Sequence, residues 1–244
     1  MPCSVWTVRP DGSGLRRLSP KCTIAGVHAS KCADEGAPAW SPDGRQLAIN
    51  YAIGSDHNNQ IEFSELVVID ADGRDRRVVT RYTHHQGDLG EAVWSPDGRR
   101  LLYERVPAVS EGEPQRPSLW VVDARGGGST RVTHPGLRAG DHPDWSPDGS
   151  RIVFRTMPNG DDGTGSDVMT ARPDGSGMRQ LTHNTGNDRV LSSSFSPDGR
   201  WIVFGRSGVA AEPDVWIMRA DGSGRRPVTR TPAWDSAPDW GPAR

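Results

Sequence analysis

The sequence predicts an all-β propeller built from stacked four-stranded sheets. Three observations predict this fold class. One turn motif recurs at blade-sized steps, a second turn motif recurs out of phase with it, and short β-branched and aromatic blocks stand between the turns. Together they indicate a repeated unit of four strands, and no stretch remains that is long enough for a helical domain.

The first motif is an aromatic residue followed by Ser-Pro-Asp-Gly. Its copies are Trp40–Gly44, Trp94–Gly98, Trp145–Gly149 and Phe195–Gly199, with a degenerate copy at Trp240–Pro242. The leading aromatics are 54, 51, 50 and 45 residues apart, which is typical of propeller blades and not of helical hairpins. Because Pro presets φ and Gly accepts a left-handed conformation, the motif predicts a tight hairpin turn.

The second motif ends in Gly and lies between two strand-like blocks. Its copies start at Arg9, Asp70, Asp123, Arg172 and Arg219. An apolar block precedes each copy, and a short strand ending in a hydroxyl residue follows it, so one unit contains four strands, a to d. In the c strands both faces are apolar, for example at Leu119–Val122, which predicts a sheet buried between two other sheets.

Counting strands gives four complete blades. A c–d pair precedes them at residues 5–8 and 15–18, and an a strand follows them near Pro238 to Trp240. The prediction is a single domain over residues 1–244 with about five blades, the fifth being a composite of the two ends that lacks a b strand. The alternative is a truncated six-bladed form. We expect either that Met1 is not the natural start or that the ring closes imperfectly.

These paired turns, with a Leu/Val-Thr strand after the second, resemble the WD40-like PD40 repeat of TolB-like propellers, from about Val5 to Trp240. The resemblance implies protein or peptide binding and a periplasmic or extracellular location, since TolB is a periplasmic protein that binds other proteins of an envelope complex. Related repeats serve as lids on peptidases. The chain departs from the family pattern because it is short for six blades and no α/β domain precedes the repeats.

Composition argues against two classes of partner. Lys and Arg number 29 against 31 Asp and Glu, so the net charge of −2 provides no basic field for nucleic acid or an anionic membrane. No apolar run approaches about 18 residues and no leader-type segment is visible, so we expect neither membrane insertion nor a signal peptide in this chain. We expect a monomer.

The three cysteines, Cys3, Cys22 and Cys32, lie near the N-terminus, and their odd number leaves at least one thiol unpaired within the chain. In an oxidising compartment Cys22 and Cys32 could form a disulfide that closes a loop. The alternative is that all three are reduced and inert.

The candidate binding residues lie in the segments that lead into the a strands. In propellers of this kind these segments lie at one mouth of the central channel, where partners dock. The candidates are Asp34, Glu35, Asp88, Glu91, Asp141, His142, Asp188, Trp234 and Asp235. A ring of carboxylates could bind a basic peptide or a cation. The alternative is that they cap turns or face water.

Other chemical signals have structural interpretations. The histidines lie at unequal offsets from the repeat aromatics, and Asp70–Asp75 lacks the spacing of a calcium loop, so no metal site and no cofactor are predicted. The repeat positions of most tryptophans assign them to packing between blades, and Trp201 is also interpreted as structural. Trp234 lies outside the repeat pattern and is the one proposed for ligand contact.

The sequence therefore favours a non-catalytic platform for a protein, peptide or extended polymer. The alternative is an enzyme, either a metal-dependent lyase or lactonase-type propeller or the lid of a peptidase. No Gly-x-Ser-x-Gly motif occurs, so the peptidase alternative would require a longer parent protein.

Overall fold

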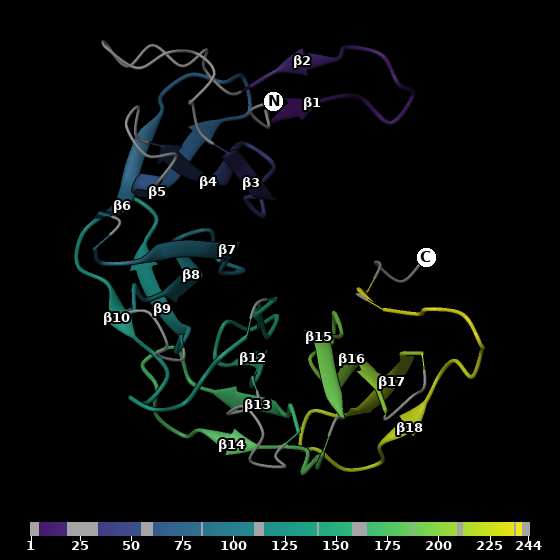
Figure 1. The fold of residues 1–244 in the computed structure, drawn as a ribbon. Helices are drawn as coiled ribbons and strands as arrows, with labels where there is room; N and C mark the ends of the chain where they lie inside the picture. The colour runs from purple at the N-terminus through teal and green to yellow at the C-terminus, as the bar shows by residue number, and fades with distance from the viewer. Residues whose placement is uncertain are drawn as a thin grey trace. The chain divides into compact units, whose positions relative to one another are not determined.

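The computed structural model describes residues 5–18, 34–54, 61–83, 85–109, 115–140, 142–157, 165–186, 188–208, 212–236 and 238–240. Strands are the only regular elements in these ranges, which confirms the all-β class (Figure 1). Across the same ranges no helix of membrane-spanning length and apolarity occurs. Cys3, Cys22, Cys32, His84 and Asp141 lie outside the described residues.

Four antiparallel sheets reproduce the predicted four-stranded unit, and their strands follow one another in chain order. The first sheet contains β3 (Asp34–Trp40), β4 (Gln46–Gly54), β5 (Ile61–Asp70) and β6 (Arg77–Thr83). The second contains β7 (Asp88–Trp94), β8 (Arg100–Val106), β9 (Ser118–Asp123) and β10 (Thr130–Arg131). The third contains β11 (Asp144–Trp145), β12 (Ile152–Arg155), β13 (Val168–Ala171) and β14 (Arg179–Gln180). The fourth contains β15 (Arg189–Phe195), β16 (Trp201–Ser207), β17 (Asp214–Arg219) and β18 (Arg226–Pro227).

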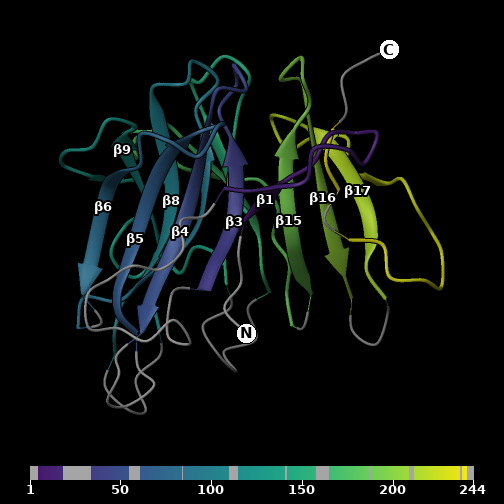
Figure 2. The ribbon, with the colours of Figure 1, turned by 90° about the horizontal axis from the view of Figure 1, so that it is seen from above.

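The predicted N-terminal pair is also present. It is a two-stranded sheet of β1 (Trp6–Thr7) and β2 (Arg16–Arg17). Figure 2 shows β3 to β6 side by side within their sheet. The chain divides into two compact units, residues 1–115 with 122–129 and residues 116–121 with 130–244. The number of blades in the whole ring remains a prediction.

Two expectations about element bounds are wrong. No strand forms at Pro238 to Trp240, because no described strand of the second unit pairs with it. The b–c connection of the first sheet is shorter than the loop expected from Gly54 to Ser64, since β4 and β5 extend their ladder until Gly54 lies opposite Ile61. β-Branched and aromatic cross-strand pairs favour such an extension.

The Ser-Pro-Asp-Gly turns are built by their own side chains. In all four, the Ser hydroxyl donates to the Asp carboxylate at 2.6–2.7 Å, and the Gly N–H donates to the Ser carbonyl at 2.8–2.9 Å. The four glycines have φ of 67–68°. The Ser hydroxyl is the largest cause of the lowered pKa of each turn aspartate, namely Asp43, Asp97, Asp148 and Asp198. The motif is therefore structural, as predicted.

In the second, third and fourth sheets, the threonine that follows the outer strand extends the hydrogen bonding of the ladder beyond the end of that strand. Each of these hydroxyl groups accepts a hydrogen bond from a backbone N–H near the start of the c strand. The pairs are Leu119 with Thr133 at 3.1 Å, Val168 with Thr182 at 2.9 Å and Val215 with Thr229 at 2.9 Å. The hydroxyl of Thr182 also donates to the buried carboxylate of Asp167 at 2.7 Å. This accounts for the recurrence of threonine at a position that the repeat alone marked only as a hydroxyl.

The repeat aromatics pack as predicted in three sheets and differently in the first. Trp94, Trp145 and Phe195 are 8%, 4% and 6% exposed, whereas Trp40 is 50% exposed. The Trp94 indole N–H donates to the Ala39 carbonyl on the inner strand before it, at 3.0 Å. The sheet before Trp40 consists of β1 and β2. Among the described residues of this unit it contains no inner strand against which Trp40 could pack. Trp6 is likewise exposed, so its assignment to blade packing is wrong within this unit.

Candidate functional site

The entry segments, meaning the residues that lead into each inner strand, are fastened to the sheet before them. In the second unit, the N–H groups of Ala139 and Asp235 donate to the carbonyls of Pro117 and Pro213, both at 2.9 Å. The Asp188 carbonyl accepts from the Ser166 N–H at the same distance. Each of these bonds joins an entry segment to the b–c connection of the preceding sheet, so these segments are held in place by backbone hydrogen bonds.

In the first unit, four predicted site residues lie on inner strands. Asp34 and Glu35 lie opposite Ala52 and Tyr51 in the ladder. Asp88 begins β7, and burial raises the pKa of its carboxyl group. Among the described residues, no hydrogen-bond donor or cation contacts this carboxylate. Glu91 is half-buried on the same strand.

In the second unit, the Asp188 carboxylate forms an ion pair. Its Oδ2 lies 2.6 Å from Nη2 of Arg206, and both side chains are largely buried. The Arg206 guanidinium lies 5.1 Å from the centre of the Trp216 ring, a cation–π distance. His142 is exposed and has a left-handed backbone with φ of 55°. Because Arg206 already neutralises the Asp188 carboxylate, a ligand would meet a paired carboxylate at this position.

The last entry segment, residues 231–236, holds the two remaining candidates. Trp234 is 65% exposed, and its indole N–H donates to the Ser236 hydroxyl at 2.6 Å. The Thr231 hydroxyl donates to the Asp235 carboxylate at 2.9 Å. Thr231 is further fixed by its N–H, which donates to Asp214 at 3.3 Å. The segment therefore presents an indole face to solvent from a hydrogen-bonded turn, with a carboxylate beside it.

The structure also brings together three polar residues that sequence reasoning missed. The Asp144 carboxylate accepts from the Ser194 hydroxyl at 2.8 Å, and Ser194 also lies 3.3 Å from the Asp239 carboxylate. Burial is the largest cause of the raised pKa of Asp144. A usable signal was present, since Pro-Asp-Trp occurs at both 143–145 and 238–240.

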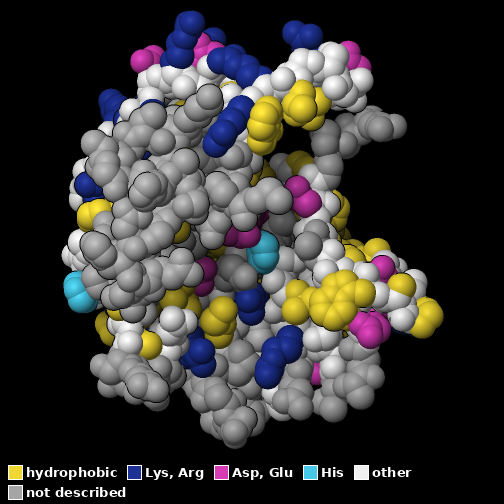
Figure 3. All heavy atoms as spheres, turned by 45° about the horizontal axis from the view of Figure 1, so that its top comes forward, with side chains coloured by type: hydrophobic (Ala, Val, Ile, Leu, Met, Phe, Trp, Pro, Cys, Tyr) yellow, Lys and Arg dark blue, Asp and Glu magenta, His cyan; other side chains and the backbone are white. Residues whose placement is uncertain are grey.

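Metal-ligating side chains do not gather in the described part of the chain. No group of three or more His, Cys, Asp or Glu positioned to hold a metal ion is found there. In the Asp70–Asp75 turn, Asp70 accepts from the Gln46 amide and Asp72 from the Arg74 N–H, both at 2.9 Å. These hairpin contacts agree with the structural interpretation of that turn. On the face shown in Figure 3, acidic and basic side chains are interspersed.

Comparison with known proteins decides the family. The model of the TolB β-propeller domain, PD40, matches residues 23–244. The chain belongs to this family. One relative, the uncharacterized protein Atu1656 of Agrobacterium fabrum, is 30% identical over 221 residues, which cover 74% of this chain and 67% of the relative. The Tol-Pal system protein TolB of Anaeromyxobacter dehalogenans is 35% identical over 57% of this chain and 30% of its own length.

The same propeller fold occurs in proteins with other activities. An oligogalacturonate lyase solved with manganese has a TM-score of 0.69 and 17% identity, covering 95% of this chain and 60% of the lyase. Dipeptidyl-peptidase 5 of Porphyromonas endodontalis is 28% identical over 48% of this chain and 16% of its own length. The TolB-like chain thus spans only part of these relatives, and the lyase shows the fold alone.

Proposed function

We propose that this chain is a non-catalytic binding propeller of the TolB type, which holds a basic segment of a protein partner against its entry segments. Its membership of the TolB β-propeller family supports this role, and one relative is a protein of the Tol-Pal system. On the same ground we propose a periplasmic or extracellular location. The predicted carboxylate ring at the channel mouth is part of this proposal.

The observation that carries the proposal is the exposed indole of Trp234. Tryptophan is among the residues that contribute most to protein interfaces, because its large rigid face buries much apolar area at little entropic cost. Trp234 lies outside the repeat and does not belong to either hydrophobic core cluster of the described residues. The hydrogen bonds at Thr231, Asp235 and Ser236 fix the turn before any partner arrives, which lowers the cost of binding.

The neighbouring charge favours a basic partner. Asp235 lies next to Trp234, and its carboxylate receives only a neutral hydroxyl donor among the described contacts. In the first unit Asp88 presents a carboxylate with no described donor or cation. Lysine or arginine side chains would supply the missing countercharge. Because exposed charges are screened by salt, such binding weakens as ionic strength rises.

Titration of the chain with a short lysine-rich peptide that carries one phenylalanine tests the proposal. Isothermal calorimetry at low and high salt should give saturable binding that weakens with salt. Trp234→Ala should weaken it about tenfold, as expected when about 1.4 kcal/mol of interface contact is lost. Trp6→Ala is the matched control, since Trp6 is 52% exposed but lies outside the entry segments. Salt-independent binding, or equal losses in both variants, would contradict the proposal.

A further inference from the structure

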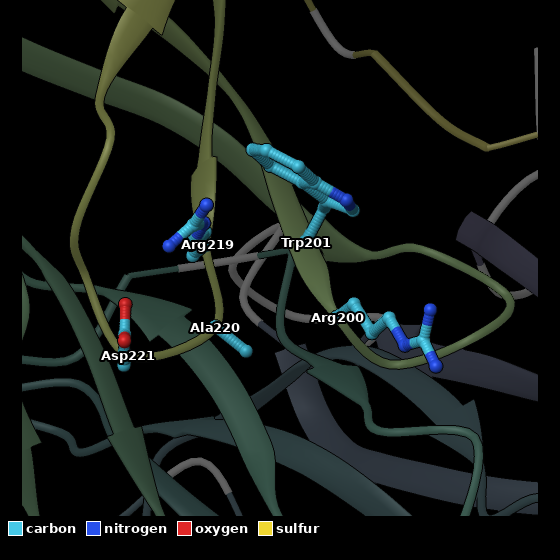
Figure 4. Close-up of a pocket in the computed structure, with 5 residues that line it drawn as sticks. All are labelled: Arg200, Trp201, Arg219, Ala220 and Asp221. Atoms are coloured by element: carbon cyan, nitrogen blue, oxygen red, sulfur yellow. The ribbon is translucent and has the colours of Figure 1, made fainter.

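A cavity of about 510 Å³ lies at the turn edge of the fourth sheet, away from every predicted site residue. It is lined by Arg200 and Trp201 at the start of β16 and by Arg219, Ala220 and Asp221 at the end of β17 and the turn that follows (Figure 4). Trp201 and Arg219 are direct partners in the ladder. The Arg219 guanidinium lies 6.0 Å from the centre of the Trp201 ring. The cavity therefore combines a half-buried indole with cationic groups.

Trp201 departs from the repeat at the place where the cavity occurs. The second residue after the Ser-Pro-Asp-Gly turn, which is Trp201 in the fourth sheet, is Gln46 in the first sheet, Arg100 in the second and Arg151 in the third. In the first sheet the Gln46 amide donates to Asp70 at 2.9 Å, so a polar pair occupies this position. The fourth sheet has an indole there instead.

Neither the turn nor the core accounts for this indole. The Ser-Pro-Asp-Gly turn uses the backbone N–H groups of Arg200 and Trp201, which donate to Asp198 and Ser196, and no contact of the turn involves the Trp201 side chain among the described hydrogen bonds. The core cluster of this sheet contains the next residue, Ile202, but does not include Trp201. A side chain that serves neither purpose is available for a ligand.

The charges on the cavity wall favour an anion. The guanidinium of Arg200 is 4.0 Å from Asp198, and both side chains are mostly exposed, so this ion pair is weak. The carboxylate of Asp221 is engaged by Ser223, which is the largest cause of its lowered pKa. The cavity lining thus includes two arginines and one carboxylate, and that carboxylate is already used by the turn. Guanidinium groups bind carboxylates in fork geometry, and an indole packs on flat apolar groups.

We propose that this cavity binds the C-terminal carboxylate of a peptide that ends in an aromatic residue. The α-carboxylate and the terminal side chain are only a few bonds apart, which matches the short distance from the Arg219 guanidinium to the Trp201 ring. A volume of about 510 Å³ suits one or two residues and lies in the range of small-ligand pockets. The site is independent of the entry segments and of the function proposed for them.

The test compares a tetrapeptide ending in Phe as the free acid with the same peptide as its C-terminal amide, by calorimetry. We expect saturable binding of the free acid and at least tenfold weaker binding of the amide. Trp201→Gln, which introduces the residue of the first repeat, and Arg219→Gln should each weaken binding of the free acid about tenfold. Arg172→Gln is the matched control, because Arg172 opens the corresponding turn of the third sheet and does not line the cavity.

Several outcomes would overturn the site. Equal affinity for the acid and the amide would show that the carboxylate is not recognised. Absence of saturable binding at millimolar peptide would show that the cavity is not a site for this ligand. If an amidated peptide with an internal aspartate or glutamate binds as tightly as the free acid, the site recognises any carboxylate and not the C-terminal one. Thermal melts of the variants check that each is folded.

Discussion

The Asp144 carboxylate accepts a hydrogen bond from the backbone N–H of Phe195 at 2.9 Å, and so joins the inner strands of the third and fourth sheets. The same oxygen accepts from the Ser194 hydroxyl, while the other accepts from the N–H of Trp145 at 2.8 Å. Asp239 has the same local geometry toward Trp240. The pair of Pro-Asp-Trp segments therefore places an acceptor immediately before the aromatic residue of the repeat.

Replacing Asp144 tests this contact between sheets. Asp144→Asn keeps one acceptor oxygen and should lower the free energy of unfolding by less than about 1 kcal/mol, whereas Asp144→Leu leaves the N–H groups of Phe195 and Trp145 without their acceptor and should cost about 3 kcal/mol. Urea unfolding of the two variants provides the measurement. Equal losses would mean that side-chain shape, and not the acceptor, is what matters at this position.

The effect of pH on the Asp144→Asn variant has a definite sign. Burial raises the pKa of Asp144 above its unfolded value, with a smaller contribution from the nearby Asp239. A group with a raised folded pKa contributes stability below its unfolded pKa, and this contribution is lost as pH rises through the folded pKa. The wild type should therefore gain stability relative to Asp144→Asn as pH falls from 7 toward the unfolded pKa of about 4. A difference that stays constant or moves the other way would contradict the assignment.

Contacts that need only neighbouring residues could be predicted from the sequence, whereas contacts between sheets could not. The turn at Ser41 to Gly44 is complete within six residues, so its motif specified its geometry. The partners of Asp144 lie 50 and 51 residues away, at a distance in sequence that no local pattern reports. The pairing of Asp188 with Arg206 was missed for a related reason, since it depends on how the first two strands of the sheet align. Asp188 was predicted as a binding residue because of its carboxylate, and in the structure that carboxylate is paired with Arg206.

The repeat aromatics should differ in their effect on stability according to their burial. Trp145→Ala should cost about 3–5 kcal/mol, as large core aromatics do. Trp40→Ala should cost clearly less, because this side chain is 50% exposed whereas Trp145 is 4% exposed. His142→Ala, at an exposed position, should have a mild effect. Denaturant unfolding measures all three, and a loss for Trp40→Ala as large as that for Trp145→Ala would show that Trp40 is covered in solution.

The glycine of the second turn provides a test of how closely the sheets approach one another. Gly175 has φ of 85°, and a Cβ added to it would lie 2.6 Å from the carbonyl oxygen of Val132, the residue directly after the outer strand β10 of the preceding sheet. Gly12 has nearly the same φ, at 81°, but an added Cβ would meet no described atom within 4 Å. Left-handed backbone strain alone costs about 1–2 kcal/mol for alanine, so Gly12→Ala should lose about that much. Gly175→Ala should lose about 1–3 kcal/mol more, because the carbonyl must also move. Urea unfolding of both variants measures the difference, and equal losses would mean that the third sheet shifts without resistance and that this contact does not hold the two sheets together.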